Sequence, residues 1–294
     1  MSSKVLILGG TGMLGHTLFM QLVLQRDLDV YATGRGSPDL SRWFPKEAVE
    51  RIRPDVDADN FDSVIRAFAA IQPDIVINCI GLIKQTWYGG DPLSSIVINS
   101  LLPHRISMVC RTAGARLIHV STDCVFDGKK GNYTENDISN ATDLYGRSKF
   151  LGEVAYSPHC VTLRTSIIGH EIKGRLGLIE WFMSQDKKIQ GYKNAIFSGF
   201  PTIEVAHILR DYILPNQNLT GIYHISSDPI SKYELLKLVA EKYDKKIEIE
   251  PYDDFYQNRS LDSSLFRKIT GYEPPTWPEL IEKMYKHYMS FYKK

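Results

Sequence analysis

The strongest constraint on the fold is a glycine-rich segment close to the N-terminus. The apolar run from Val5 to Leu8 leads into Gly9-Gly10-Thr11-Gly12-Met13-Leu14-Gly15, and apolar residues then recur at helical spacing over 13–25. Glycine allows a tight turn and a close approach of the backbone to a pyrophosphate, while the following helix N-terminus offers N–H donors. A glycine triplet alone is a weak indication, but this one has the strand–turn–helix context that dinucleotide binding requires. The residues expected to bind the cofactor here are Gly9, Thr11, Gly12, Met13, Leu14 and Gly15.

The rest of the first half alternates strand-like and helix-like segments. Strands are expected at 4–8, 29–33, 75–78 and 116–121, and helices at 13–25, 61–71 and 93–113, the last despite Pro103. This alternation predicts right-handed βαβ units and an α/β fold with a Rossmann-type, doubly wound parallel sheet.

After about Thr165 the rhythm changes. Helices are expected at 178–184, 203–214, 232–243 and 278–289, with short strands at 222–225 and 247–249. We therefore expect residues 1–165 to form an NADP-binding Rossmann domain. Residues 166–294 are expected to form mainly a smaller C-terminal α/β substrate-binding region, with some segments returning to the Rossmann core.

Composition excludes several classes of protein. Hydrophobic residues make up 43% and charged residues 23%, values close to the globular average, which excludes wholesale disorder and fibrous structure. The net charge of +1 gives no strong footprint for nucleic acid or an anionic membrane, and no apolar run approaches the roughly 20 residues of a spanning helix. Four widely spaced cysteines form neither a disulfide framework nor a zinc site. With no signal peptide recognisable, we expect a cytoplasmic protein without a metal, and the sequence leaves a monomer or a homodimer open.

Cofactor choice depends on the end of the second strand. NAD-specific sites usually place an acidic residue there for the ribose 2′-hydroxyl, but this chain reads Tyr31-Ala32-Thr33-Gly34-Arg35-Gly36-Ser37. Arg35 can instead pair with a 2′-phosphate, with Ser37 helping, although a solvated loop arginine would look the same. Asp57 is placed to meet the adenine amine or is an ordinary surface carboxylate. NADP(H) is favoured, and NAD(H) stays open.

Tyr145 and Lys149 are four residues apart and would share one face of a helix. A neighbouring ammonium favours the phenolate and is expected to lower the tyrosine pKa, so that Tyr145 can exchange a proton with a substrate oxygen. This spacing is common on any helix. It gains weight because Thr122 follows the 116–121 strand, at the carboxyl edge where a parallel sheet presents its site.

Together, the glycine turn, Thr122, Tyr145 and Lys149 have the order and spacing of the extended short-chain dehydrogenase/reductases. Within them the chain resembles the dTDP-4-dehydrorhamnose reductase family in four segments: Ser121-Thr122-Asp123-x-Val125-Phe126-Asp127-Gly128, Tyr145-Gly146-x-Ser148-Lys149-x-x-Gly152-Glu153, Leu163-Arg164-Thr165-Ser166 and Ser198-Gly199-Phe200-Pro201-Thr202. The resemblance implies NADPH-dependent reduction of the 4-keto group of a nucleotide-linked deoxysugar, in the synthesis of polysaccharide precursors. Tyr145 would donate the proton, Lys149 would support it electrostatically and Thr122 would be the hydroxyl partner.

The resemblance also places further residues. The backbone of Cys79, Ile80 and Gly81 would line the cofactor, and Asn99 resembles an asparagine that supports the active site. By position alone, Arg259 is a candidate contact of a diphosphate or an ordinary surface salt-bridge residue, and His170 lies near the expected pocket. The residues expected at the substrate are Lys84, Gln85, Thr122, Asp123, Cys124, Ile167, Phe200 and Arg259.

Two departures from the family bear on the substrate. Cys124 and Ile167 stand where family members often carry an aromatic residue that would stack on the sugar. A UDP-linked 4-keto-2-acetamido sugar is therefore an alternative to the dTDP-linked rhamnose precursor. Dehydratases typically follow the threonine with Asp-Glu, and Cys124 replaces that glutamate. A sugar-nucleotide epimerase of the same fold stays open, as does a non-catalytic NADP-binding subunit, since a regulatory subunit of methionine adenosyltransferase resembles the same family.

Overall fold

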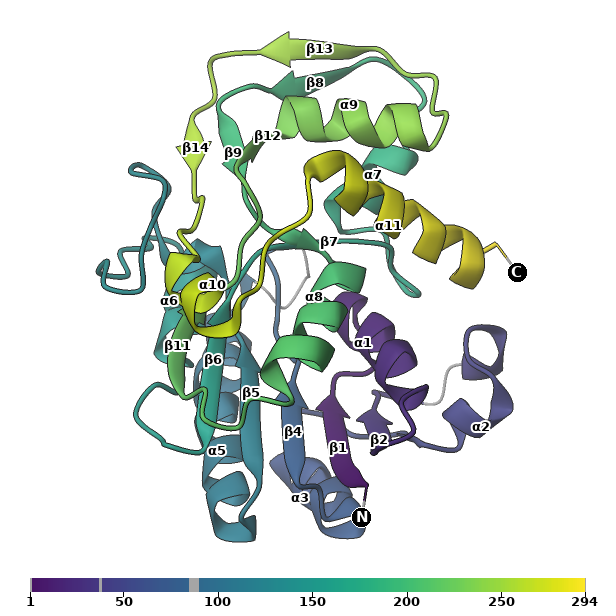
Figure 1. Ribbon diagram of the computed structural model, residues 1–294, viewed down its shortest axis with the longest axis vertical. Helices are drawn as coiled ribbons and strands as arrows, with labels where there is room; N and C mark the ends of the chain where they lie inside the picture. Colours follow the sequence, from purple (N-terminus) through teal and green to yellow (C-terminus); the bar gives the residue numbers. More distant parts are fainter. Residues whose placement is uncertain (1, 37–38, 85–89, 294) are drawn as a thin grey trace.

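A seven-stranded parallel sheet forms the centre of the protein (Figure 1). The computed structural model describes residues 2–36, 39–84 and 90–293. The sheet has the order β11-β6-β5-β4-β1-β2-β3. Its strands are β1 (Ser3–Leu8), β2 (Leu28–Thr33), β3 (Ile52–Arg53), β4 (Ile75–Asn78), β5 (Arg116–Val120), β6 (Cys160–Arg164) and β11 (Gly221–His224). The expected Rossmann-type α/β fold is confirmed.

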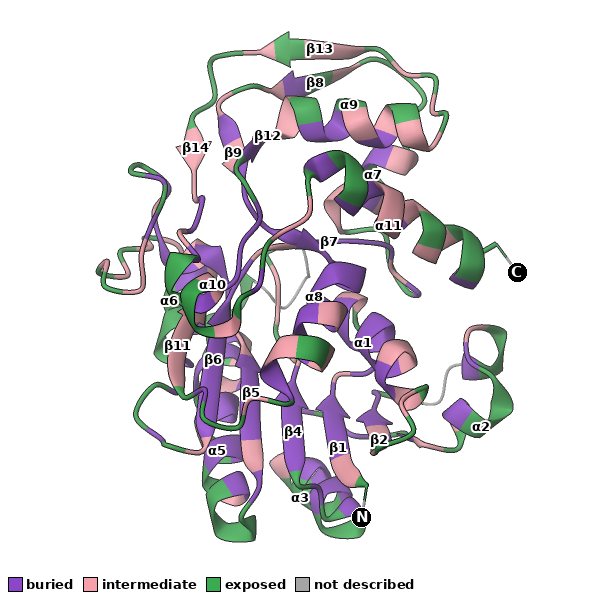
Figure 2. Ribbon diagram, viewed as in Figure 1, coloured by how far each residue is buried: buried purple, intermediate pink, exposed green. Residues whose placement is uncertain are grey.

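Helices cover both faces of this sheet because successive strand residues point to opposite sides. Val5 and Ile7 of β1 pack with α1 (Met13–Val23) and α8 (Thr202–Ile208). Leu6 and Leu8 pack on the other side with α3 (Phe61–Ile71) and α5 (Leu102–Ala113). The central strands are buried along most of their length (Figure 2), as a sheet covered on both faces requires.

The order of strands places a switch point beside β1. From β1 the chain moves outward to β2 and β3, and then returns to add β4 on the other side of β1. In doubly wound sheets, ligands bind in the crevice at the carboxyl ends of the strands at such a switch point. The glycine-rich turn lies there, directly after β1.

A composite helix between β4 and β5 follows the prediction for 93–113. It consists of α4 (Pro92–Ser95), the π-helical segment η3 (Ile96–Leu101) and α5. Pro103 has no N–H for the carbonyl of Asn99, and the preceding turn is wound more loosely, with the Leu102 amide bonded to Val97. By length and composition this helix could cross a membrane, but half of its apolar window is buried inside the protein, as in a core helix.

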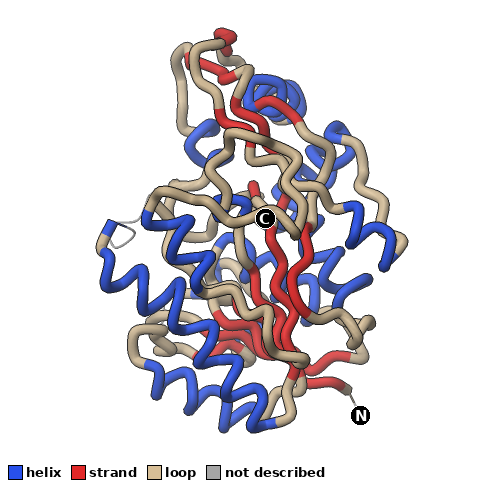
Figure 3. Tube along the Cα trace, turned by 90° about the vertical axis from the view of Figure 1, so that its left-hand side faces the viewer, coloured by secondary structure: helices blue, strands red, loops and turns tan. Residues whose placement is uncertain are grey.

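The C-terminal region lies beyond the carboxyl end of the central sheet (Figures 1 and 3). Its short strands form three small sheets: β7 (Ile167–Ile168) with β10 (Phe200–Pro201), β8 (Ile189–Tyr192) with β13 (Ile249–Tyr252), and β12 (Ile230–Ser231) with β9 (Ala195–Phe197) and β14 (Gln257–Asn258). The helices are α7 (Leu178–Met183), α9 (Lys232–Lys242), α10 (Ser264–Thr270) and α11 (Trp277–Phe291). Of the two strands expected here, one lies at β11 and the other is shifted from 247–249 to β13.

Short helical segments complete the chain. They are η1 (Leu40–Arg42), α2 (Lys46–Val49), η4 (Asp123–Val125), α6 (Leu144–Leu151) and η5 (Leu209–Ile213). The helix expected at 203–214 is α8 followed by the π-helical η5. The late segments β11 and α8 belong to the Rossmann core, since β11 pairs with β6 and α8 packs against α1.

A buried carboxylate joins α8 to α11. Lys283 Nζ lies 2.7 Å from Glu204 Oε2, and the Tyr272 hydroxyl donates to Glu204 Oε1 at 3.0 Å. Burial raises the pKa of Glu204, but hydrogen bonds from His207, Lys283 and Tyr272 outweigh it and lower the pKa to about 2. Glu204 is therefore an ionised anchor between the Rossmann core and the C-terminal helix.

Candidate active site

The glycine-rich turn has the geometry of a phosphate cradle. The Gly12 amide donates to the Gly9 carbonyl at 3.0 Å, and the Gly10 amide donates to Thr33 at 2.8 Å, which fixes the turn against β2. A side chain at Gly15 would overlap the Gly9 carbonyl, so the turn closes only with glycine. Within the described chain, no side chain caps the N-terminus of α1. Its N–H groups can therefore receive the pyrophosphate of a dinucleotide.

The segment after β4 lies between this turn and Lys149. A methyl group at Gly9 would lie 3.1 Å from Ile80 Cγ1, and one at Gly81 would lie 3.7 Å from Lys149 Nζ. Asn99 holds the next residue, because its Oδ1 accepts from the Leu82 amide at 2.8 Å and its Nδ2 donates to the Leu82 carbonyl at 3.1 Å. Cys79–Gly81 thus line the path from the turn to Lys149, where the resemblance predicts the cofactor.

Asn99 also supports the helix that carries the tyrosine and lysine. Its Nδ2 lies 3.2 Å from Ser148 Oγ on α6. A side chain at Gly152, just after α6, would overlap the Asn99 carbonyl, to which Pro103 cannot donate the usual i,i+4 helical hydrogen bond. The π-helical turn and the glycine together let η3 and α6 approach closely, and this gives the supporting role predicted for Asn99 a physical basis.

Tyr145 and Lys149 lie on α6 next to the Thr122 turn. Asp143 caps the helix by accepting from the Gly146 amide at 2.9 Å. A side chain at Gly146 would overlap the Cys124 carbonyl, so this glycine lets α6 lie directly on η4. The structure therefore brings Thr122, Tyr145 and Lys149 together, as the sequence predicts.

The protonation of this group differs from the sequence prediction. Burial raises the pKa of Tyr145, the nearby Cys124 adds to this, and a hydrogen bond with the Thr122 hydroxyl opposes it. Lys149 Nζ donates a hydrogen bond to the Val120 carbonyl at 2.9 Å. The expected lowering of the Tyr145 pKa is wrong in this structure, since desolvation outweighs the ammonium. Burial also lowers the pKa of Lys149 to about 8.

The two thiols at the site are protonated. Burial raises the pKa of Cys79 and of Cys124 to about 12. The thiolate is the nucleophilic form, so neither cysteine is an activated nucleophile near neutral pH. Burial also raises the pKa of Asp123, although Arg259 opposes the shift. Within the described residues, no group of three or more metal-ligating side chains occurs.

Two cations predicted for the substrate converge on the start of α6. Lys84 Nζ lies 2.9 Å from Asp143 Oδ2 and 5.8 Å from the centre of the Tyr145 ring. Arg259 donates to the Phe126 carbonyl at 2.8 Å and lies 3.8 Å from the same Asp143 carboxylate. Asp143 thus orders both cations beside the tyrosine, a role that the sequence analysis missed.

Lys232 is a further cation that the sequence analysis missed. It is the first residue of α9, after the Ser231 cap, and it is half-buried. Burial lowers its pKa, while the charges of Asp123 and Cys124 raise it and that of Arg259 lowers it. Its charge therefore acts on the same site from the C-terminal region. The position of Lys232 depends on where the fold places β12, the strand that ends just before it.

A buried ion pair connects three of the four segments that resemble the reductase family. Arg164 donates from Nε and Nη2 to the two carboxylate oxygens of Glu153, at 2.8 and 2.7 Å. The Ser121 hydroxyl donates to the same carboxylate at 2.7 Å. Because Thr122 follows Ser121, the pair fixes the end of β5 that presents the threonine.

Phe200 and His170 do not take the places that the sequence analysis predicts for them. Phe200 was expected at the substrate but has no exposed surface and packs in the core against Tyr272. Its partner Ile167 is half-buried in β7. His170 does not reach the pocket, because Glu180 and Tyr243 take its two ring nitrogens at 2.6 and 2.9 Å.

The predicted adenosine contacts are at the outer end of the cofactor path. Arg35 and Asp57 are both exposed after β2 and β3, and Asp57 Oδ1 accepts from the Asp59 amide at 3.2 Å. Ser37 and Gln85 lie outside the described residues.

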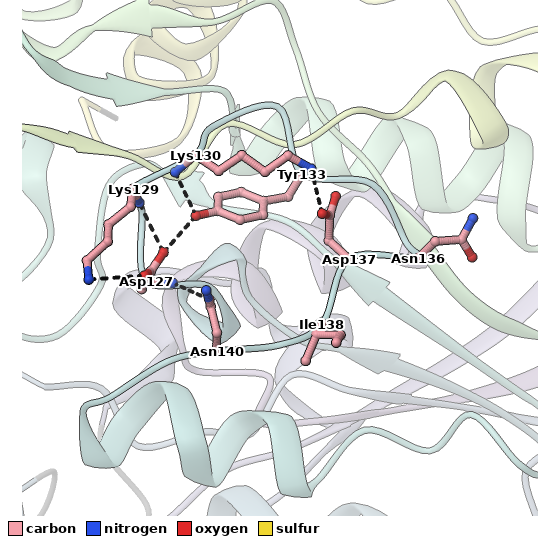
Figure 4. Close-up of a pocket in the computed structure, with 8 residues that line it drawn as sticks. All are labelled: Asp127, Lys129, Lys130, Tyr133, Asn136, Asp137, Ile138 and Asn140. Atoms are coloured by element: carbon pink, nitrogen blue, oxygen red, sulfur yellow. Dashed lines mark hydrogen bonds and ion pairs between the residues drawn. The ribbon is translucent and has the colours of Figure 1, made fainter.

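A surface hollow beside the 126–140 loop is distinct from this site (Figure 4). The Tyr133 hydroxyl donates to Asp127 Oδ1 at 2.8 Å, and Lys130 Nζ lies 2.5 Å from Asp137 Oδ1. These polar groups pair with one another and hold the loop. The residues that line the hollow are Asp127, Lys129, Lys130, Tyr133, Asn136, Asp137, Ile138 and Asn140.

A Rossmann sheet with a glycine-rich turn at its switch point, and with a threonine, a tyrosine and a lysine at the same edge, defines the class of the extended short-chain dehydrogenase/reductases. Within it, the chain belongs to the family described as the RmlD substrate binding domain, whose model matches residues 3–290. The family supports a reductase or dehydrogenase type of enzyme.

The similar proteins carry two different names, methionine adenosyltransferase 2 subunit beta and dTDP-4-dehydrorhamnose reductase. Methionine adenosyltransferase 2 subunit beta of Danio rerio is 28% identical over 254 residues, which cover 82% of this chain and 74% of the relative. A dTDP-4-dehydrorhamnose reductase of Aggregatibacter actinomycetemcomitans is 24% identical and covers 96% and 98%. The crystal structure of dTDP-4-dehydrorhamnose reductase from Bacillus anthracis in complex with NADP is similar in fold, with a TM-score of 0.80, 21% identity and coverage of 98% and 100%.

Proposed function

We propose that the protein is an NADPH-dependent reductase of the 4-keto group of a nucleotide-linked deoxysugar. The observation that carries this proposal is a half-buried tyrosine beside a threonine hydroxyl, at the end of a path that begins at a phosphate cradle. Tyr145 and Thr122 face each other, and Gly81 lies between the cradle and Lys149. The proposal places the reaction in the cytoplasm, in the supply of polysaccharide precursors, and the four free cysteines support that location.

The cofactor site of this chain suits NADPH. The glycine turn offers unobstructed N–H groups to the pyrophosphate, and β2 ends without a carboxylate for a ribose 2′-hydroxyl. Arg35 is exposed at that position and can pair with a 2′-phosphate. The structure of the NADP-bound Bacillus anthracis enzyme, similar in fold over 98% of this chain, supports the same choice.

The side chains around Tyr145 suit carbonyl reduction. A bound reduced nicotinamide supplies the hydride for this chemistry. Because burial raises the pKa of Tyr145, its phenol is protonated at neutral pH and can donate to the substrate oxygen. Thr122 can hydrogen-bond the same oxygen as negative charge develops on it. Lys149, next to Gly81, can hold the sugar hydroxyls of the cofactor and support the phenolate after proton transfer.

The substrate side of the site is cationic. Lys84, Lys232 and Arg259 come from three different segments, and the charges of all three interact with Cys124, while Lys84 Nζ also lies 5.8 Å from the centre of the Tyr145 ring. Such a cluster fits the diphosphate of a nucleotide sugar. Because Cys124 and Ile167 offer no aromatic face, we expect faster turnover of a UDP-linked 4-keto-2-acetamido sugar than of dTDP-4-dehydrorhamnose.

The experiment that tests this proposal follows a labelled hydrogen. The protein is incubated with NADPH deuterated at nicotinamide C4 and with dTDP- and UDP-linked 4-keto sugars, and the products are examined by mass spectrometry. The proposal expects a product that has gained one deuterium and one hydrogen. If no sugar in the panel gains deuterium while NADPH binds, the proposed reduction is wrong.

A non-catalytic subunit is the second candidate, because several relatives are named methionine adenosyltransferase 2 subunit beta. Thr122, Tyr145 and Lys149 are all present, and this complete set of side chains favours an enzyme over a non-catalytic subunit. Binding of NADPH without turnover, together with a stable complex with a methionine adenosyltransferase catalytic subunit, would favour the second candidate.

A further inference from the structure

The loop between β7 and α7, residues 169–177, packs onto the glycine-rich turn from the C-terminal region (Figure 1). A methyl group at Gly177 would lie 2.5 Å from Met13 Cε, so the end of the loop lies against the first residue of α1. Glu171 stabilises this end, since its carboxylate accepts from the Gly177 amide at 2.6 Å and from the Leu176 amide at 3.2 Å. The Glu171 carboxylate therefore fixes the conformation of this end of the loop.

The beginning of the loop is tied to the same turn through side chains. The Tyr292 hydroxyl lies 3.2 Å from the His170 carbonyl and is also hydrogen-bonded to His16 Nε2. His16 Nδ1 in turn lies 2.7 Å from the Gly12 carbonyl. Both ends of the loop are thus held against the cofactor turn, and Lys173 lies in the loop between these two fixed ends.

Arg35 follows a residue that packs against the same turn. Its neighbour Gly34 donates to the Arg53 carbonyl at 3.0 Å, and a methyl group at Gly34 would lie 3.1 Å from Thr11 Cγ2. Lys173 and Arg35 thus both belong to segments that pack against the glycine-rich turn.

The charges of these two residues act on each other. Lys173 is exposed, yet partial desolvation lowers its pKa and the positive charge of Arg35 lowers it further. Two cations within electrostatic range of each other repel, and an anion bound between them relieves the repulsion. A phosphate monoester carries about −1.5 to −2 charges near pH 7 and has three acceptor oxygens, so it fits such a position.

We propose that Lys173, from outside the segment that forms the cofactor turn, is a second cation for the 2′-phosphate of NADPH and sets cofactor choice together with Arg35. This inference rests on the cofactor part of the proposed function. Arg35 would bind the phosphate through its planar fork, and Lys173 would act as a point charge from the other side. NADH lacks the phosphate and gains nothing from Lys173.

The test compares two variants of the same loop. Lys173→Met removes the charge and keeps most of the stem, and Arg175→Met removes a charge from an exposed neighbour in the loop. Dissociation constants of NADPH and NADH are measured by fluorescence titration for each protein, with 2′,5′-ADP as a competitor that carries the same phosphate. Lys173→Met is expected to weaken NADPH and 2′,5′-ADP by about 10- to 100-fold, the range of a charge-assisted hydrogen bond. NADH should change less than twofold, and Arg175→Met should leave all three ligands unchanged.

Two results would overturn the inference. Unchanged NADPH affinity in Lys173→Met would show that the lysine does not reach the phosphate. Equal weakening of NADPH and NADH would show that the loop only supports the turn. Arg35→Ala separates this inference from the proposed function: if Arg35→Ala loses the preference for NADPH and Lys173→Met keeps it, only the inference fails. If the unmutated protein binds NADH as tightly as NADPH, the cofactor part of the proposed function fails.

Discussion

Removing one partner of the Glu153–Arg164 pair is expected to be among the most destabilising single changes at the site. Both side chains are only 3% exposed and are joined by two parallel hydrogen bonds. In Glu153→Gln the guanidinium stays buried without an anion, and Ser121 loses its charged acceptor. Breaking a buried ion pair in this way costs about 3–5 kcal/mol of unfolding free energy.

Urea denaturation followed by tryptophan fluorescence measures this loss. With an m-value of about 3 kcal/mol/M, the midpoint should fall by about 1 M or more while the slope stays the same. The matched control is Glu250→Gln, which breaks the ion pair with Lys188 on the surface, where both side chains are nearly half exposed. Exposed pairs contribute about 0–1 kcal/mol, so the control should barely move the midpoint.

A double variant separates the ion pair from simple loss of packing. Glu153→Met combined with Arg164→Met leaves no unpaired buried charge, and it should recover much of the stability lost in Glu153→Gln. If Glu153→Gln costs no more than the surface control, the buried pair does not hold the end of β5, and this reasoning is refuted.

Two further changes test the support of the fold and of the site. Because the pKa of Glu204 is lowered from 4.5 to about 2, its contribution to stability is complete above pH 4.5 and is lost as the pH falls toward 2. This contribution to the free energy of unfolding amounts to about 3 kcal/mol. Urea titrations between pH 5 and about 2 should therefore show that the stability of Glu204→Gln falls less with acid than that of the unmutated protein. Parallel plots of stability against pH for the two proteins would contradict the assignment. Gly146→Ala should push α6 away from the Cys124 carbonyl, cost about 1–3 kcal/mol and lower kcat, because small-to-large changes in tight packing are strained. Gly90→Ala, where an added methyl meets no atom of the described residues within 4 Å, is its control in the same stability and turnover assays, and equal effects would refute the steric argument.

The sequence predicts the Rossmann half of the molecule well because its pattern is local. The apolar run before Gly9 and the alternation of strands and helices fix the sheet and its switch point, and Thr122, Tyr145 and Lys149 follow from a motif with one spacing. The short strands β7, β9, β10, β12 and β14 have two or three residues each, so they carry no periodic signal and exist only through tertiary pairing.

The parts of the site that sequence reasoning misses depend on what the fold buries. Desolvation raises the Tyr145 pKa, although the i,i+4 lysine alone suggests the opposite. The position of Lys232 depends on β12, the strand before it, which pairs with β9. Phe200 lies in the core because its strand, β10, pairs with β7 there. No residue-by-residue pattern in the chain specifies these placements.

The most direct test of the account is the rate of NADPH oxidation by Tyr145→Phe with a 4-keto sugar nucleotide, measured by stopped flow, with NADPH affinity determined separately. The variant loses the proton and keeps the volume, so its kcat should fall by about 10²–10⁴-fold while NADPH affinity stays within about twofold. Lys149→Met should lower both quantities, and Thr122→Val should lower kcat less than either. If Tyr145→Phe oxidises NADPH at the unmutated rate, Tyr145 is not the proton donor and the central claim is wrong.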